Sequence, residues 1–199
     1  PYNPDGSPRP DSALVTTCPC IIDDTAHISV GAYIGPGVRI GAGARIFGGW
    51  ISEHVVIEDE CTIENSYIGP RVIIRSHATI TDSYIGARSH ILNWVTIQHA
   101  HLGQRVSIAP HTHIRKYIRI GDRTIIYAHV VIGQGTRIGS HVTICTGSHI
   151  HADYLGDWTY IGPGAYLEER VRTGIRSQIG GNVRVPAGHR IPIGYRYQG

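Results

Sequence analysis

Aliphatic residues recur at every sixth position through most of this chain. The series begins at Ile22, runs through Ile28 and Ile34, and reaches Ile191, and Thr173 alone interrupts its aliphatic character. A spacing of six places successive apolar residues on different faces of an α-helix, so the pattern excludes an amphipathic helix. Self-similarity at a short fixed period is instead typical of solenoid proteins.

A second column of small residues lies two positions before each aliphatic residue, as in Ala26, Ala32 and Val38. Each six-residue unit is therefore interpreted as a short strand and a turn, with the small residue at a crowded corner. Three units make one triangular coil, and about ten coils stack through parallel strand hydrogen bonds. The occasional five-residue steps, such as Ile46 to Ile51, all fall at the same corner. We predict an all-β, single-domain parallel β-helix.

The boundaries of this repeat divide the chain into three parts. Residues 1–20 are rich in Pro, Ser and Asp and are expected to form an extended N-terminal lead-in. Residues 21–191 form the β-helix, and residues 192–199 are expected to be a C-terminal tail.

Charge and composition restrict the partners of the chain. The net charge is +3 with 17% charged residues, and no Lys/Arg run points to nucleic acid. No stretch approaches the ~18 apolar residues that a membrane span needs. The four cysteines lack the spacing of a disulfide framework, so a reducing cytoplasm is the expected compartment.

The hexapeptide pattern of residues 21–191 resembles the left-handed β-helix hexapeptide-repeat transferase superfamily. This resemblance implies a left-handed coil, against the usual crossover rule, and a homotrimer with active sites between neighbouring subunits. It also implies acetyl-CoA or another acyl-CoA as co-substrate.

Residues 64–114 look most like the acetyltransferase domain of the bifunctional UDP-N-acetylglucosamine-forming enzyme. The similar stretches are Ser66-Tyr67-Ile68-Gly69-Pro70, Asn93-Trp94-Val95 and Ala100-His101-Leu102-Gly103, and Arg75 stands where that family binds a sugar phosphate. The chain departs from the family at three places. Gln98 and His99 stand where the family has a lysine, Pro110 occupies its catalytic His position, and His113 replaces its substrate-binding Tyr.

The register of the coils places Glu60, His77, Trp94, His111 and His129 in one outward ladder. Imidazole suits a general base because its pKa lies near neutrality. We therefore predict His111 as the catalytic base, with His99 and His113 as alternatives. The predicted substrate- and cofactor-binding residues are Arg75, Asn93, Trp94, Gln98 and His129. The same side chains are also compatible with a polar surface or a subunit interface.

Three functions remain open at this point. The leading hypothesis is an acyl-CoA-dependent acyltransferase acting on a small amine or hydroxyl, such as a sugar or sugar nucleotide. A zinc enzyme like the γ-carbonic anhydrases is the second; zinc is not favoured and no metal ligand is predicted, because the His-x4-His pair of that family is missing. The third is a non-catalytic trimeric assembly or regulatory module, favoured by the lack of any long loop.

Overall fold

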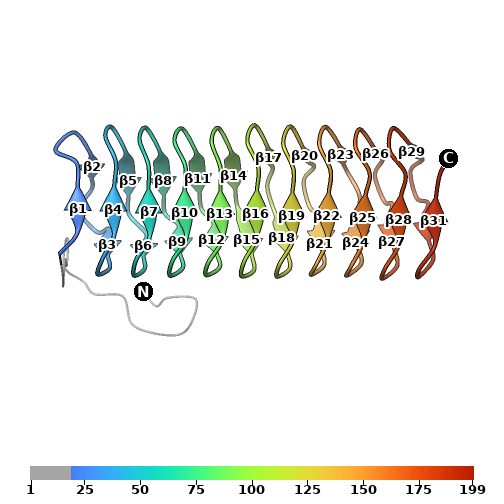
Figure 1. Cartoon of the computed structure of the whole chain (residues 1–199), viewed down its shortest axis with the longest axis horizontal. Coiled ribbons are helices and arrows are strands. Elements are labelled where there is room, and N and C mark those ends of the chain that lie inside the picture. Colours follow the sequence, from blue (N-terminus) through green and yellow to red (C-terminus); the bar gives the residue numbers. More distant parts are fainter. Residues whose placement is uncertain (1–18) are drawn as a thin grey trace.

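The chain forms a straight three-sided prism of stacked coils, seen in a computed structural model that describes residues 19–199 (Figure 1). Three parallel sheets form its sides, and we call them walls 1, 2 and 3 in the order in which the chain reaches them. The result is an all-β left-handed parallel β-helix of about ten turns, which confirms the predicted fold class.

Wall 1 is an eleven-stranded parallel sheet of two-residue strands. Its members are β1 (Ile21–Ile22), β4 (Arg39–Ile40), β7 (Val56–Ile57), β10 (Ile73–Ile74), β13 (His90–Ile91), β16 (Ser107–Ile108), β19 (Ile125–Ile126), β22 (Thr143–Ile144), β25 (Tyr160–Ile161), β28 (Gln178–Ile179) and β31 (Arg196–Tyr197).

Wall 2 has ten strands, and several in its first half extend to three residues. Its members are β2 (His27–Ile28), β5 (Arg45–Phe47), β8 (Thr62–Glu64), β11 (Thr79–Thr81), β14 (Thr96–Gln98), β17 (His113–Ile114), β20 (Val131–Ile132), β23 (His149–Ile150), β26 (Tyr166–Leu167) and β29 (Arg184–Val185).

Wall 3 also has ten strands. Its members are β3 (Tyr33–Ile34), β6 (Trp50–Ile51), β9 (Tyr67–Ile68), β12 (Tyr84–Ile85), β15 (Ala100–Leu102), β18 (Ile118–Ile120), β21 (Arg137–Ile138), β24 (Tyr154–Leu155), β27 (Arg172–Thr173) and β30 (Arg190–Ile191).

The aliphatic column fills the interior of the prism as the spacing predicts. Ile74 aligns with Ile57 and Ile91 across neighbouring coils, and all three are 0–1% exposed. The small column is buried beside it, for example at Ala78 and Val95. Thr173, the interruption of the series, is also buried, and its hydroxyl oxygen accepts a hydrogen bond from the Gly156 amide at 3.0 Å. That bond satisfies the hydroxyl in an otherwise apolar core.

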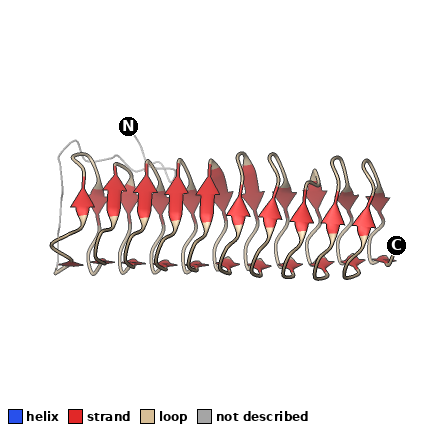
Figure 2. Cartoon of the chain, turned by 90° about the horizontal axis from the view of Figure 1, so that it is seen from above, coloured by secondary structure: helices blue, strands red, loops and turns tan. Residues whose placement is uncertain are grey.

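The turns repeat as regularly as the strands, and Figure 2 shows them in rows along the three edges of the prism. Nearly every turn holds one residue in the left-handed region; the non-glycine examples have φ of 46–62°. The amide of that residue donates to a carbonyl of the preceding coil, as from His77 to Asp59 at 3.0 Å. Equivalent turn residues are therefore stacked into ladders along each edge.

The structure refines one of the two boundary predictions. Residues 192–199 are not only a tail, because β31 pairs with β28 and extends wall 1. The lead-in predicted for residues 1–20 lies almost wholly outside the described residues. Connections between the described strands have four residues or fewer, so no long loop projects from residues 21–197.

Candidate functional site

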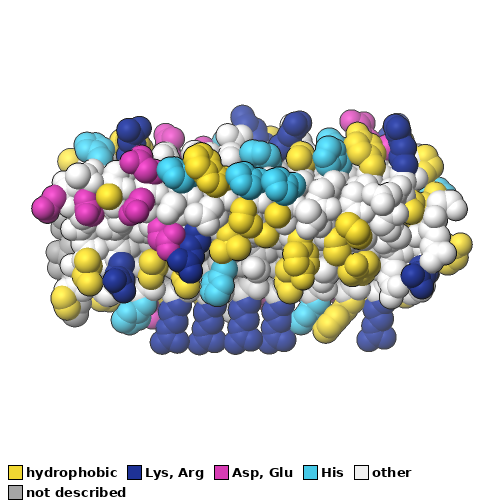
Figure 3. All heavy atoms as spheres, turned by 45° about the horizontal axis from the view of Figure 1, so that its top comes forward, with side chains coloured by type: hydrophobic (Ala, Val, Ile, Leu, Met, Phe, Trp, Pro, Cys, Tyr) yellow, Lys and Arg dark blue, Asp and Glu magenta, His cyan; other side chains and the backbone are white. Residues whose placement is uncertain are grey.

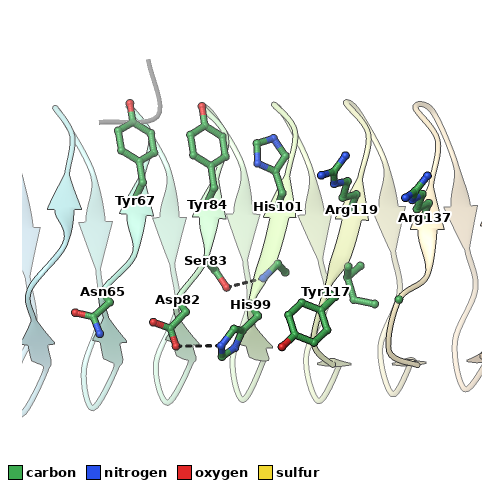
Figure 4. Close-up of a pocket in the computed structure, with 13 residues that line it drawn as sticks. Asn65, Tyr67, Asp82, Ser83, Tyr84, His99, His101, Tyr117, Arg119 and Arg137 are labelled. Atoms are coloured by element: carbon green, nitrogen blue, oxygen red, sulfur yellow. Dashed lines mark hydrogen bonds and ion pairs between the residues drawn. The ribbon is translucent and has the colours of Figure 1, made fainter. Parts of the chain in front are cut away.

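A groove of about 700 Å³ lies over wall 3 and the corner where the chain passes from wall 2 to wall 3 (Figure 4). Turn residues form one side of the groove, and outward-facing strand residues of wall 3 form the other. The lining residues that matter below are Asp82, His99 and Tyr117 from the turns and Tyr84, His101, Arg119 and Arg137 from the strands.

Serine hydroxyls hold this corner in shape. The Ser83 hydroxyl donates to the Thr81 carbonyl at 2.7 Å and accepts from the Ala100 amide of the next coil at 3.0 Å. Ser66 makes the same pair of bonds one coil earlier, to Glu64 and from Ser83. These bonds satisfy backbone N–H groups and connect adjacent coils at the corner where the step is five residues.

Asp82 and His99 occupy equivalent turn positions in adjacent coils. His99 Nε2 lies 3.6 Å from Asp82 Oδ2, and the Tyr117 ring meets the imidazole edge-on at 5.7 Å between centroids. His99 Nδ1 is buried and has no hydrogen-bond partner among the described residues. Because Nδ1 is buried, Nε2, the nitrogen beside Asp82, is the one that could exchange a proton with a ligand in the groove.

The wall 3 side of the groove changes from aromatic to basic along the prism. Tyr67 and Tyr84 stack with centroids 4.8 Å apart, and Tyr84 and His101 stack at 4.5 Å. Arg119 and Arg137 follow in the next two coils, in direct register. Tyr84 is covered on both faces by its neighbours, so these stacked rings offer edges and hydroxyl groups to a ligand, whereas guanidinium groups bind phosphate bidentately.

His101 joins the aromatic and basic halves of this side. Burial, reinforced by the positive charge of Arg119, lowers the pKa of His101 below its ordinary value. The imidazole is therefore neutral at pH 7 and stacks on Tyr84 without adding a third positive charge to the arginine pair.

Most of the residues predicted from the sequence gather at a different corner, between walls 1 and 2. Trp94 stacks on His77 at 4.0 Å, and His111 stacks on His129 at 5.0 Å, which confirms the predicted ladder geometry. Trp94, His111 and His129 are all exposed. Arg75 lies at the same corner in an ion pair with Glu58, and the Asn93 carbonyl accepts the His111 amide at 3.2 Å.

The three predicted catalytic histidines do not come together within the chain. His111 lies on the corner between walls 1 and 2, and His113 faces outward from β17 on wall 2. His99 alone lines the groove; Gln98, its neighbour, ends β14. The sequence analysis did not identify Asp82, Tyr67, Tyr84, Arg119 or Arg137 as site residues. The length of one coil could have revealed some of them. Asp82 and His99 are 17 residues apart, as are Tyr67 and Tyr84, and this spacing places each pair side by side in adjacent coils.

Metal sites and membrane spans were also sought in the described part of the chain. Residues 19–199 contain no group of three or more His, Cys, Asp or Glu side chains arranged to hold a metal ion. The same residues contain no helix long and apolar enough to cross a membrane.

Three parallel walls, coils of 17 or 18 residues and turns stacked in ladders define the class of the hexapeptide-repeat β-helix proteins with an acyltransferase-like fold. A family model described as the GMPPB C-terminal domain matches residues 16–119, just over half of the chain. The chain belongs to this family.

Solved structures support the same fold. The UDP-N-acetylglucosamine acyltransferase from Campylobacter jejuni is similar with a TM-score of 0.65 and 22% identity, over 83% of this chain and 67% of that one. The UDP-N-acetylglucosamine acyltransferase of Francisella novicida is similar with a TM-score of 0.55 and 18% identity, over 89% of this chain and 62% of that one. This chain thus spans roughly two thirds of their length. At these identities the likeness concerns the fold.

No curated protein matches the sequence. The findings support the superfamily expected from the hexapeptide pattern, and they do not single out the bifunctional UDP-N-acetylglucosamine-forming enzyme within it.

Proposed function

We propose that this chain is an acyl-CoA-dependent acyltransferase that acts, as a homotrimer, on a small hydroxyl or amine acceptor of the sugar or sugar-nucleotide class. The observation that carries this proposal is the Asp82–His99 pair in the groove beside wall 3. The fold shared with two sugar-nucleotide acyltransferases supports it as an analogy.

The roles of the groove residues follow from their positions. His99 takes the proton from the acceptor through Nε2 as the acceptor's oxygen or nitrogen attacks the thioester carbonyl, and the nearby Asp82 carboxylate stabilises the imidazolium that forms. The carbon–sulfur bond then breaks, and the same proton passes to the departing thiolate. Arg119 and Arg137 bind phosphate groups, while the stacked Tyr67 and Tyr84 offer ring edges and hydroxyl groups to a sugar or base.

This assignment prefers His99 to His111, the base expected from the sequence. His111 stacks on His129 and lies exposed, and no carboxylate is paired with it among the described residues. A carboxylate beside an imidazole stabilises the positive charge that forms when the imidazole takes a proton. His111 and His113 stay alternative bases that the experiment below examines, and Arg75, Asn93, Trp94, Gln98 and His129 stay predicted binding residues.

The test compares His99→Ala with His111→Ala and His113→Ala in an assay of thiol release from acetyl-CoA over a panel of sugar nucleotides and amino sugars. We expect His99→Ala to lower kcat about 10²–10⁴-fold, and the other two variants to stay within about twofold of wild type. A large loss in His111→Ala with a fully active His99→Ala would move the site to the other corner.

A second candidate function is a non-catalytic trimeric assembly module. The short connections favour it, because no loop among residues 21–197 projects over the groove to close an acceptor pocket. Absence of turnover with every acceptor, together with a trimer in solution, would support the module instead of the transferase.

A further inference from the structure

A row of four arginines follows the corner where the chain passes from wall 3 to wall 1. Arg71, Arg88, Arg105 and Arg123 hold the same turn position in successive coils, with φ of 55–59°. The amide of each donates to the preceding coil; for Arg88 and Arg105 the acceptors are the carbonyls of Pro70 and Ala87, both at 2.9 Å. Adjacent coils are about 4.8 Å apart, so the row is about 14 Å long. We call these four residues the arginine ladder.

The arginine ladder points away from the protein. All four residues are exposed, and Figure 3 shows a row of basic side chains projecting side by side from one edge of the prism. The ion pairs within residues 19–199 involve other cations: Arg75, His99 and Arg184. Within the described residues none of the four arginines forms an ion pair, so the neighbouring guanidinium groups repel one another.

Two hollows lie along the arginine ladder. The first, of about 370 Å³, is lined by Arg71 and Arg88 together with Glu53 and Gln104. The second, of about 280 Å³, is lined by Arg105 and Arg123 together with Asp122 and Gln104. Each hollow therefore combines two guanidinium donors with one carboxylate acceptor and an amide side chain.

An apolar platform continues the same edge of the prism. His141, which lines the second hollow, stacks on Trp158 with centroids 3.9 Å apart and planes 2° from parallel. Trp158 is 56% exposed. A ligand lying along the arginine ladder would reach the exposed edges of these two stacked rings beyond the second hollow.

We propose that the arginine ladder docks an acidic polypeptide segment in extended conformation. Carboxylate side chains of that segment pair with the guanidinium forks, and its main-chain N–H groups donate to Glu53 and Asp122. The row of about 14 Å accommodates about four extended residues, and an apolar residue beyond them packs on Trp158. A nucleic acid fits less well, because its backbone has no N–H donor to pair with the two carboxylates.

This surface is separate from the proposed transferase site. The groove of Asp82 and His99 lies on wall 3 and the corner before it, whereas the arginine ladder lies on the corner after wall 3. Docking of an acidic segment is therefore expected whether or not the chain transfers acyl groups, and its failure would leave the transferase proposal unaffected.

Fluorescence anisotropy with the full chain tests the proposal. The probe is a fluorescein-labelled peptide of six glutamates ending in one tryptophan, and the competitor is a single-stranded oligothymidylate of equal charge. We expect saturable peptide binding that weakens as salt rises, about tenfold or more weaker in the double variant Arg88→Gln/Arg105→Gln. We also expect the oligothymidylate to compete less well than unlabelled peptide.

The matched control is Arg172→Gln/Arg190→Gln, which removes two exposed arginines that are likewise neighbours in register, but on wall 3. This variant should bind the peptide within about twofold of wild type. It removes as much positive charge as the ladder variant does, but from wall 3 and not from the arginine ladder. Arg88→Lys/Arg105→Lys keeps the charge, loses the guanidinium fork and should bind at an intermediate level.

Three results would overturn the proposal: no saturable peptide binding by the wild-type chain, equal losses in the ladder variant and the wall 3 variant, or tighter binding of the oligothymidylate. Circular dichroism of each variant checks that the coils remain folded.

Discussion

The polar and aromatic side chains of this molecule are grouped by turn position. Each turn position recurs from coil to coil, so its side chains are stacked along one edge of the prism. The register of the repeat predicted the ladder of Trp94, His111 and His129, and the structure confirms it. The pairing of Asp82 with His99 was missed, although the same arithmetic places them in adjacent coils. A repeat tells which residues are stacked, but the direction of a side chain and the hollow beside it depend on packing that spacing does not encode.

Cys61 is a titratable residue that lies buried inside the prism. It takes the place of a small residue between Ala44 and Ala78, is 0% exposed, and donates its Sγ–H to the Arg75 carbonyl at 3.0 Å. Burial, with help from nearby Glu58 and Asp59, raises the pKa of the thiol to about 11. The thiolate is the reactive form, so this cysteine is protected in the folded chain.

We predict that iodoacetamide at pH 8 modifies the half-buried Cys145 much faster than Cys61, as measured by peptide mass spectrometry. The raised pKa also makes a contribution to stability that is full below about pH 9 and is lost as the pH rises through about 11. Cys61→Ala should remove that alkaline loss, and Cys145→Ala should keep it. Equal labelling of both thiols would contradict the buried assignment.

At the scale of elements, the corner between walls 2 and 3 differs from the other two. All five-residue steps fall there, and serine hydroxyls at Ser66 and Ser83 bridge adjacent coils in the shortened turns. The spacing alone predicted this asymmetry, since a coincidental pattern would scatter its five-residue steps over all three corners. The sequence did not predict β31, because its core residue is Tyr197 and the series was followed only to Ile191.

Glycines after the aliphatic column allow neighbouring coils to approach closely. A Cβ on Gly86 would lie 2.3 Å from the Gly103 carbonyl oxygen and 2.5 Å from its carbon, which are backbone atoms that cannot give way locally. We predict that Gly86→Ala lowers the free energy of unfolding by at least about 2 kcal/mol, measured by urea denaturation.

The control for this prediction is Gly147→Asn. Gly147 has a φ of +71° and nothing within 4 Å of an added Cβ, and Asn182 holds the same turn position with a φ of 55°. Asparagine tolerates this conformation, so the change should stay within about 1 kcal/mol of wild type. If both variants lost equal stability, close packing between coils would not be the reason for the glycine at position 86.

The whole molecule is a rigid scaffold whose three edges differ in chemistry. One edge carries the histidines and Trp94, the second borders the groove, and the third carries the arginine ladder. The fold class and the number of coils could be predicted from the repeat, because each strand must place one aliphatic side chain in the narrow interior. Handedness came only from resemblance, since mirror-image coils would have the same spacing.

Binding of coenzyme A to the purified chain, followed by isothermal titration calorimetry, tests the proposed transferase most directly. We predict saturable binding at one site per chain in the micromolar range, weakened about tenfold or more by Arg119→Gln/Arg137→Gln in the groove and unchanged by Arg172→Gln/Arg190→Gln. Heat that fails to saturate up to millimolar coenzyme A, or binding that the groove variant leaves intact, would contradict the account.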